Sequence, residues 1–154
     1  MATVTAANYG VKYSGGGFWA THREADSQTF KRGQLVYLSG GYVTECASDA
    51  VLFTGIAGAD ATNVVAAWTD IPVFHIADDT EIYLCVINNV TAAAGMETHK
   101  GAFYGLTTAS NINYLDYSEV TAKPFHVIDK WEFDAWTDTG CRYVVKIQPT
   151  MLTG

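Results

Sequence analysis

Short runs of β-forming residues recur along this chain, and clusters of turn-forming residues separate them. Residues 34–38 and 42–46 are such runs, joined by Ser39-Gly40-Gly41, in which glycine can supply the positive φ that hairpin turns require. No segment carries the 3.6-residue apolar period and end caps of a long amphipathic helix. Strands every 8–12 residues or so predict an all-β domain, a compact small barrel or sandwich.

Further strands are predicted downstream of this hairpin. Residues 51–57 read as a third strand, and residues 71–76 and 81–87 as a second hairpin around the acidic turn Asp78-Asp79. Residues 142–148 read as the final strand, which closes the barrel.

The N-terminal part of the chain differs from the rest. Residues 1–29 are rich in Ala, Thr and Gly and show no sustained period, but they carry four aromatic residues within positions 9–19. Because exposed aromatic side chains favour association, we expect an extended arm, with one strand near residues 18–21, that packs on a partner. The remainder, residues 30–154, is expected to form a single β-barrel-like domain. The candidate contact residues of the arm are Tyr9, Tyr13, Phe18 and Trp19.

Two stretches of the chain resemble each other. Gly33 and Gly101 each follow a basic residue and precede a strand, at an offset of 68, and Tyr42–Tyr114 and Phe53–Phe125 repeat at an offset of 72. Four extra residues in the second turn, at positions 107–113, would explain the difference. We therefore expect two related three-stranded meanders, each covering the apolar face of the other; a chance match is the alternative.

The composition disfavours several classes of protein. The chain has 9 basic and 16 acidic residues, a net charge of −7, where an average domain of this length would hold about 38 charges. The low charge suggests a surface that is covered in use. Nucleic-acid binding requires a basic face, and only Lys31 and Arg32 are adjacent basic residues. No apolar run is long enough for a transmembrane helix, and the aliphatic and aromatic content disfavours disorder.

The N-terminus does not read as a secretory signal, so we expect synthesis in a cytoplasm. Cys46, Cys85 and Cys141 are odd in number and lack metal-binding spacing. They are expected to be reduced, mostly buried thiols.

Candidate chemistry is sparse. His22, Glu24 and Asp26 would share one face of a strand and could form a metal site or an acid–base pair, although a solvated segment is the simpler interpretation. The acidic group of Asp78, Asp79 and Glu81 could bind Ca²⁺ but does not match an EF-hand loop. We therefore expect no cofactor, no metal and no enzymatic activity.

The tryptophan-rich segment at residues 130–136 alternates between apolar and charged positions, which predicts a strand with one core face. Trp136 would lie on the charged face, where it is a candidate partner contact or a platform for a sugar.

The stretch FKRGQLVYLSGGYV at residues 30–43, followed by FTGIA at residues 53–57, resembles the head decoration (capsid cement) proteins of tailed bacteriophages. The segment FHIADDTEIY at residues 74–83 is similar to their aspartate turn and following strand. The more specific similarity covers residues 30–57 and a looser one extends to about residue 148. The longer aromatic N-terminal segment and the tryptophan-rich C-terminal third depart from the family pattern.

The resemblance implies a β-rich virion protein on the capsid exterior, which binds the expanded shell without doing chemistry. Its partners would be the major capsid protein and further copies of itself, as a trimer, with neither nucleic acid nor membrane involved. The alternatives are a tail-tube or head–tail joining protein, a carbohydrate-binding module that uses Trp136 or Trp68, and an enzyme built on the His22 group or on a cysteine.

Overall fold

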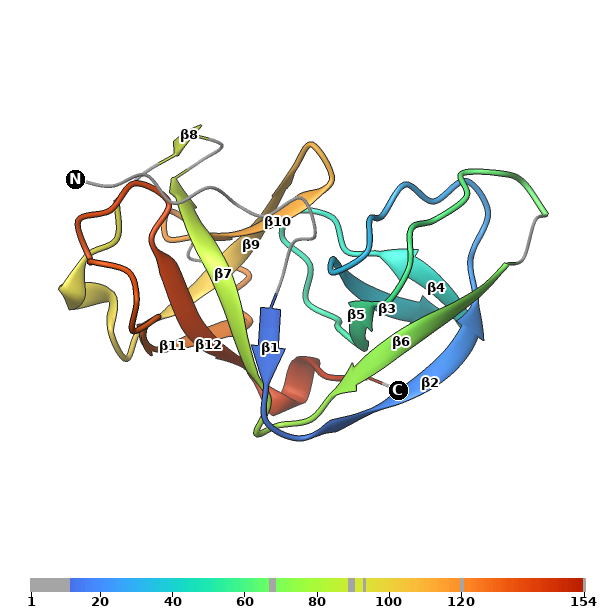
Figure 1. Cartoon of the computed structure of the whole chain (residues 1–154), viewed down its shortest axis with the longest axis horizontal. Helices are drawn as coiled ribbons and strands as arrows, with labels where there is room; N and C mark the ends of the chain where they lie inside the picture. The colour runs from blue at the N-terminus through green and yellow to red at the C-terminus, as the bar shows by residue number, and fades with distance from the viewer. Residues whose placement is uncertain (1–11, 67–68, 89–90, 93, 120, 154) are drawn as a thin grey trace.

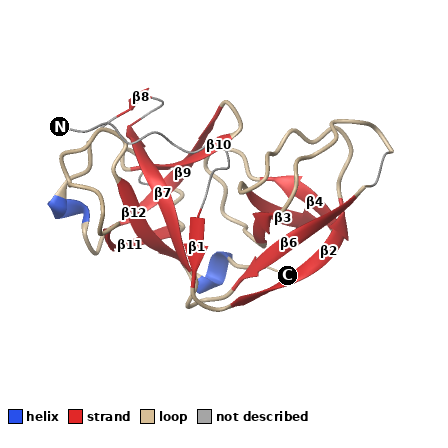
Figure 2. Cartoon of the chain, in the orientation of Figure 1, coloured by secondary structure: helices blue, strands red, loops and turns tan. Residues whose placement is uncertain are grey.

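The computed structural model describes residues 12–66, 69–88, 91–92, 94–119 and 121–153, and in these ranges the chain is all-β, as expected. Figure 2 shows strands throughout, with two single-turn 3-10 helices, η1 and η2. No helix among these residues is long and apolar enough to cross a membrane. The strands of the N-terminal half are β1 (Lys12–Ser14), β2 (Gly17–Arg23), β3 (Leu35–Ser39), β4 (Tyr42–Glu45), β5 (Gly55–Ala57) and β6 (Asp70–Ile76). Those of the C-terminal half are β7 (Glu81–Asn88), β8 (Thr91–Ala92), β9 (Phe103–Ala109), β10 (Ile112–Asp116), β11 (Phe125–Lys130) and β12 (Arg142–Ile147), with η1 (Glu97–His99) and η2 (Pro149–Met151).

The strands form two adjacent units, which Figure 1 shows side by side. The first barrel consists of β2 to β6 in the order β2-β6-β5-β3-β4, and a parallel bridge between Glu24 and Val43 joins its two ends. The second barrel is the ring β7-β10-β9-β11-β12, which the β7–β12 pairing closes. β1 and β8 add to the edges of β7.

Both barrels have the same connectivity. In each, the second strand pairs with the third in a hairpin and with the fourth on its other side: β3 with β4 and β5, β9 with β10 and β11. The last strand pairs antiparallel with the fourth and the first, namely β6 with β5 and β2, and β12 with β11 and β7. The first strand meets the third in parallel in both barrels. The chain is therefore a structural tandem duplication of a five-stranded barrel.

The backbone hydrogen bonds fix which positions are equivalent. Gly33 N donates to Ala57 O in the first barrel as Gly101 N donates to Val127 O in the second. The side chains inside the first barrel form one hydrophobic cluster, and the equivalent side chains of the second barrel belong to the larger hydrophobic core. In chain order, Val36, Val43, Ala57, Ile71 and Val73 correspond to Tyr104, Leu115, Val127, Tyr143 and Val145.

One hydrophobic core extends across both barrels, and a second, smaller cluster lies inside the first. Val36, Ala57 and Val73 point into the first barrel, whereas their neighbours Leu35, Ile56 and Phe74 belong to the core of the second barrel. Because side chains alternate along a strand, β3, β5 and β6 are buried on both faces, which explains their continuous apolar sequences.

The structure corrects the predicted hairpin of residues 71–76 and 81–87. β6 pairs with β2 and β5, and β7 pairs with β1, β8, β10 and β12, so the two strands belong to different barrels. The turn at Asp78-Asp79 is the connection between the barrels. Alternation and turn residues identify strands locally but do not determine which strands pair.

The repeat is present but extends further than predicted. Each three-stranded unit has its first strand in the middle, so it is not a meander, and each continues into a full barrel. Both hairpin turns contain two residues with positive φ, Gly40-Gly41 and Ser110-Asn111. The four extra residues therefore lengthen β9 and β10 rather than the turn. The predicted match of Phe53 with Phe125 is wrong: Phe125 is equivalent to Gly55, and its ring meets that of Phe53 across the barrels at 5.8 Å between centroids.

The described part of the predicted N-terminal arm belongs to the sheets. β1 pairs with β7, and β2 pairs over its whole length with β6, so the segment does not extend away from the barrels. The strand expected near residues 18–21 is confirmed as part of β2. At the other end of the chain, β11 stops at Lys130, and the expected strand at residues 130–136 is instead a series of turns that leaves Phe133 74 % exposed.

Candidate functional site: an aromatic surface and an open edge on β2

The residues proposed as a metal or acid–base site do not come together. The Glu24 carboxylate is buried, accepting hydrogen bonds from the backbone N–H and the hydroxyl of Thr62, and Asp26 accepts one from Ala66 N. His22 instead bonds to His75, with their Nε2 atoms 2.8 Å apart. Among the described residues, no group of three or more His, Cys, Asp or Glu side chains could hold a metal ion.

Two of the predicted contact residues, Phe18 and Trp19, are neighbouring exposed aromatic residues of β2, one on each face of the strand, and together they are called the aromatic surface. Phe18 is 58 % exposed and Trp19 is 53 % exposed. Because neighbouring side chains of a strand point to opposite faces, the two rings flank the strand on both sides.

Both rings are held against β6. Phe18 stacks on His75, with ring centroids 4.5 Å apart and an interplanar angle of 13°. Trp19 meets Phe74 edge-on at 5.5 Å, and it also lies over Gly58, where an added Cβ would come within 2.8 Å of the indole. The aromatic surface therefore combines exposure with fixed orientation, which lowers the entropy lost on binding.

The histidine beneath Phe18 has a lowered pKa, which favours its neutral form. Burial lowers the pKa of His75, and the neighbouring His22 lowers it further. In the Nε2–Nε2 hydrogen bond one ring donates and the other accepts, an arrangement that two imidazolium rings cannot make.

β2 is also an edge strand of its sheet. It lies at one end of the strand order, and its partner β6 carries Pro72 opposite Thr21. The hydrogen-bond pattern alternates along β2: Glu24 N donates toward β6, to Thr69 O, and Ala25 N donates away from it, to Val43 O. The backbone N–H and C=O of Thr21 therefore face away from β6, and no residue in the described ranges pairs with them.

Of the other predicted contact residues, the structure describes the backbone of Tyr13 and the whole of Trp136. Tyr9 and Trp68 are outside the described residues. The backbone of Tyr13, in β1, pairs with Ile82 of the second barrel. Trp136 is half-buried and packs edge-on against Tyr143 at 5.4 Å between ring centroids. Among the predicted contact residues that the structure describes, Phe18 and Trp19 alone lie next to each other on one exposed strand.

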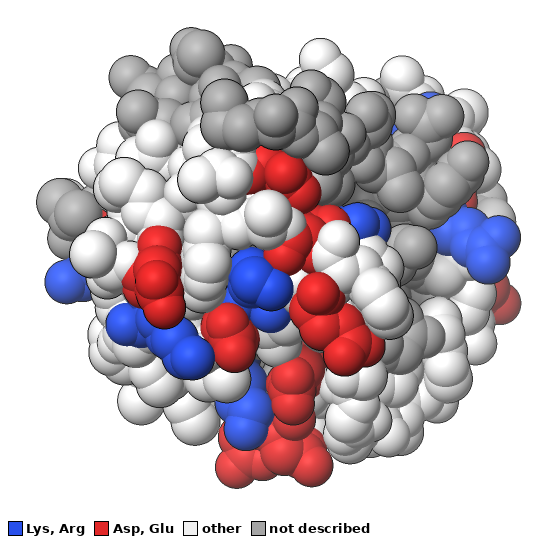
Figure 3. Space-filling model, turned by 60° about the vertical axis from the view of Figure 1, so that its left-hand side comes forward, with Lys and Arg blue, Asp and Glu red and all other residues white. Residues whose placement is uncertain are grey.

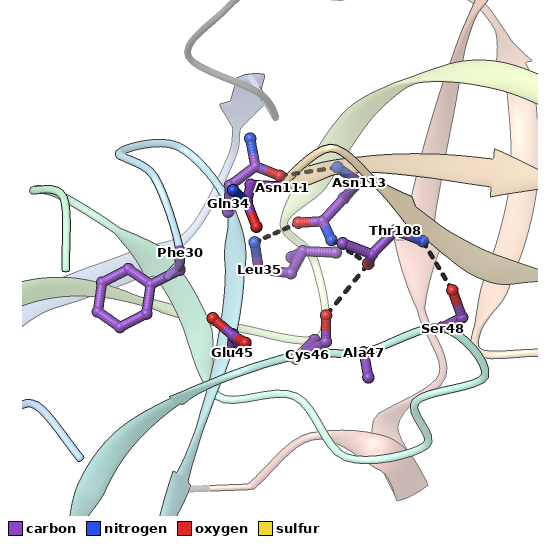
Figure 4. A pocket seen from close by; sticks show the side chains of 10 residues that line it. All are labelled: Phe30, Gln34, Leu35, Glu45, Cys46, Ala47, Ser48, Thr108, Asn111 and Asn113. Atoms are coloured by element: carbon purple, nitrogen blue, oxygen red, sulfur yellow. Dashed lines mark hydrogen bonds between the residues drawn. The ribbon is translucent and has the colours of Figure 1, made fainter. Parts of the chain in front are cut away.

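A cavity of about 360 Å³ lies between the two barrels (Figure 4). On its wall, Asn113 N donates to Gln34 Oε1 and Leu35 N donates to Asn113 Oδ1, at 2.7 and 2.6 Å. The Gln34 amide nitrogen is buried and has no hydrogen-bond partner among the described residues. No sequence pattern indicated this cavity, because contacts between the two barrels bring its residues together.

The three cysteines are free and buried, as expected. Burial raises the pKa of Cys85 to about 11 and that of Cys141 to about 12, and it also raises the pKa of Cys46. Because the thiolate is the reactive form, these side chains are poor nucleophiles in the folded protein.

No family model, curated protein or solved structure matches the chain.

Proposed function

We propose that this chain is a non-enzymatic structural protein of a virion, a decoration (cement) protein that binds the outer surface of an expanded phage capsid. Its partners would be the major capsid protein and further copies of itself, as a trimer. The observation that carries the proposal is the aromatic surface of Phe18 and Trp19, held on an edge strand and more than half exposed.

The chemistry of this surface suits a protein partner. Trp is enriched at the energetic centres of protein interfaces, where a few anchors carry most of the binding free energy. Phe18 and Trp19 already occupy fixed positions against His75 and Phe74. Each Å² of apolar surface buried on binding would contribute about 25 cal/mol of favourable free energy, and the side chains would lose little further freedom.

The distribution of exposed apolar residues favours the first barrel as the binding unit. Of the ten large hydrophobic residues that are exposed in the described ranges, seven lie in the first barrel. The seven are Phe18, Trp19, Tyr42, Val51, Leu52, Val64 and Val65. Figure 3 brings forward the left-hand side of Figure 1, where the second barrel lies, and shows acidic and basic side chains interspersed on that face.

The sequence resemblance supports the same assignment. Residues 30–57, which carry its more specific part, span β3, β4 and β5 of the first barrel. A protein that binds only the expanded shell stabilises that state by mass action. Several weak contacts held together in one oligomer add through effective concentration.

Binding to shells tests the proposal. The purified chain is mixed with expanded heads, assembled without it from the virus that encodes it, and with unexpanded heads, and bound protein is measured by co-sedimentation. We expect saturable binding to the expanded heads alone. The variant Phe18→Ala/Trp19→Ala should bind at least tenfold more weakly.

Phe133→Ala is the matched control, because Phe133 is an exposed aromatic residue outside the first barrel. Its binding should equal that of the wild type. Equal binding by the wild type and the Phe18/Trp19 variant would contradict the role of the aromatic surface. No binding to expanded heads at all would contradict the proposed function.

A further inference from the structure

The duplication shows what one edge of the first barrel lacks. By the backbone pairings, Val73 is equivalent to Val145, so their partners on the first strands, Ala20 and Ile82, are equivalent as well. The hydrogen bonds of Glu24 N to Thr69 O and of Val86 N to Cys141 O give the same offset.

Thr21 of β2 therefore occupies the position of Tyr83 in β7. In the second barrel this position is covered: β1 adds antiparallel to β7, with Lys12 opposite Tyr83. β12 lies on the other side of Tyr83, through Val144.

The neighbours along each edge confirm that the two positions match. On β7, β1 is followed along the same edge by β10, which pairs in parallel at Val86. On β2, the closing bridge from Glu24 to Val43 takes the place of that parallel pairing. The place of β1 beside Thr21 holds no described strand.

We propose that this edge of β2 binds the N-terminal residues 1–11 of a second copy of the chain as an added antiparallel strand. The inference rests on the proposed self-association and assigns it a site. β1 shows that the N-terminal part of this chain supplies such a strand to the equivalent edge of the second barrel. Main-chain hydrogen bonds would supply affinity, and Phe18 and Trp19 beside the edge would supply apolar contacts.

The segment assigned as the occupant fits the site in length and charge. Residues 1–11 lie outside the described residues, precede β1 directly and contain no Asp, Glu, Lys or Arg. Eleven extended residues span at most about 40 Å, which is enough to reach a neighbouring subunit. Thr3-Val4-Thr5 is a run of β-branched residues, which favour strands. Because the donating and accepting surfaces differ, the contact is heterologous and can close into a ring such as a trimer.

The test uses two variants that each remove one half of the contact. Thr21→Pro removes the outward N–H and places a ring at the edge, and it leaves the bonds to β6 intact because the Thr21 N–H does not face β6. Thr21→Val retains the N–H and is the matched control. Deletion of residues 2–11 removes the added strand and keeps β1.

Size-exclusion chromatography with light scattering reads out the oligomer, and near-UV circular dichroism confirms that each variant is folded. We expect the wild type and Thr21→Val to form the same oligomer, and Thr21→Pro and the deletion to be monomers. A mixture of these two variants should form a 1:1 complex, because one retains the strand and the other the edge.

The proposal is overturned if the wild type is monomeric, if either variant alone assembles like the wild type, or if the mixture stays monomeric. Since no capsid is present, failure here is distinct from failure of shell binding.

Discussion

Replacing Asn113 with Ala tests how the two barrels are held together. Asn113 is 3 % exposed, and its Oδ1 accepts the N–H of Leu35, a fully buried residue of the other barrel, at 2.6 Å. Its Nδ2 donates to Thr108 Oγ1 at 2.8 Å. The alanine variant leaves the Leu35 N–H without an acceptor between the barrels.

A buried donor left unsatisfied costs about 1–3 kcal/mol. The adjacent cavity can admit a water to Leu35 N–H, so we expect a loss of about 2 kcal/mol in the free energy of unfolding. For a chain of this length, that loss lowers the melting temperature by about 4–8 °C. Urea unfolding, followed by circular dichroism, measures the free energy, and differential scanning calorimetry measures the melting temperature.

Ser48→Ala is the control at the same boundary. Ser48 Oγ accepts the N–H of Thr108 at 3.0 Å, but Ser48 is exposed, so water can replace it. Its loss should cost less than about 0.5 kcal/mol. If Asn113→Ala is as stable as the wild type, or if Ser48→Ala is equally destabilised, the buried polar contact does not hold the barrels as argued.

Three further predictions concern stability and reactivity. Burial, and then the neighbouring His22, lower the pKa of His75, so the unfolded state binds more protons than the folded state. The free energy of unfolding should therefore fall as the pH drops below about 6.5. Urea titrations at pH 7.5 and 5.5 should show a smaller fall for His75→Gln than for the wild type. The three buried cysteines should not react with a thiol reagent at pH 8 in the folded protein, and all three should react in denaturant. Labelling of Cys85, whose pKa burial raises to about 11, in the absence of denaturant would contradict its burial. Ser110→Gly should raise the free energy of unfolding by about 1 kcal/mol, since Ser110 has a φ of 50°, and no gain in urea unfolding would count against this strain.

Local patterns predicted most strands of this fold. Alternating β-formers on either side of Gly40-Gly41 identified β3 and β4, because a two-residue turn with positive φ needs only local sequence. The final strand β12 was predicted from its own local run of β-forming residues. At residues 131–136 the pattern misled, because alternating aromatic and acidic residues also fit a series of turns.

Pairing between distant strands could not be predicted. β6 and β7 are separated by four residues and look like a hairpin, yet each completes a different barrel. The full duplication was hidden because equivalent interior positions differ in residue type, as at Val36 and Tyr104 or at Ile71 and Tyr143.

The candidate site was predicted in part. Phe18 and Trp19 could be chosen from the sequence because aromatic residues are unusual in a segment with so few charges. The open edge at Thr21 could not, since it depends on which strand lies on each side of β2.

The most direct test of the proposed cement function is the thermal stability of the shell itself. Expanded heads lacking this chain are heated with increasing amounts of the purified protein, and release of the packaged contents or loss of intact shells is followed by light scattering and electron microscopy. The proposal predicts that the disruption temperature rises and then reaches a plateau at a fixed number of copies per shell, because the chain binds only the intact expanded state. An unchanged disruption temperature at saturating protein would contradict it.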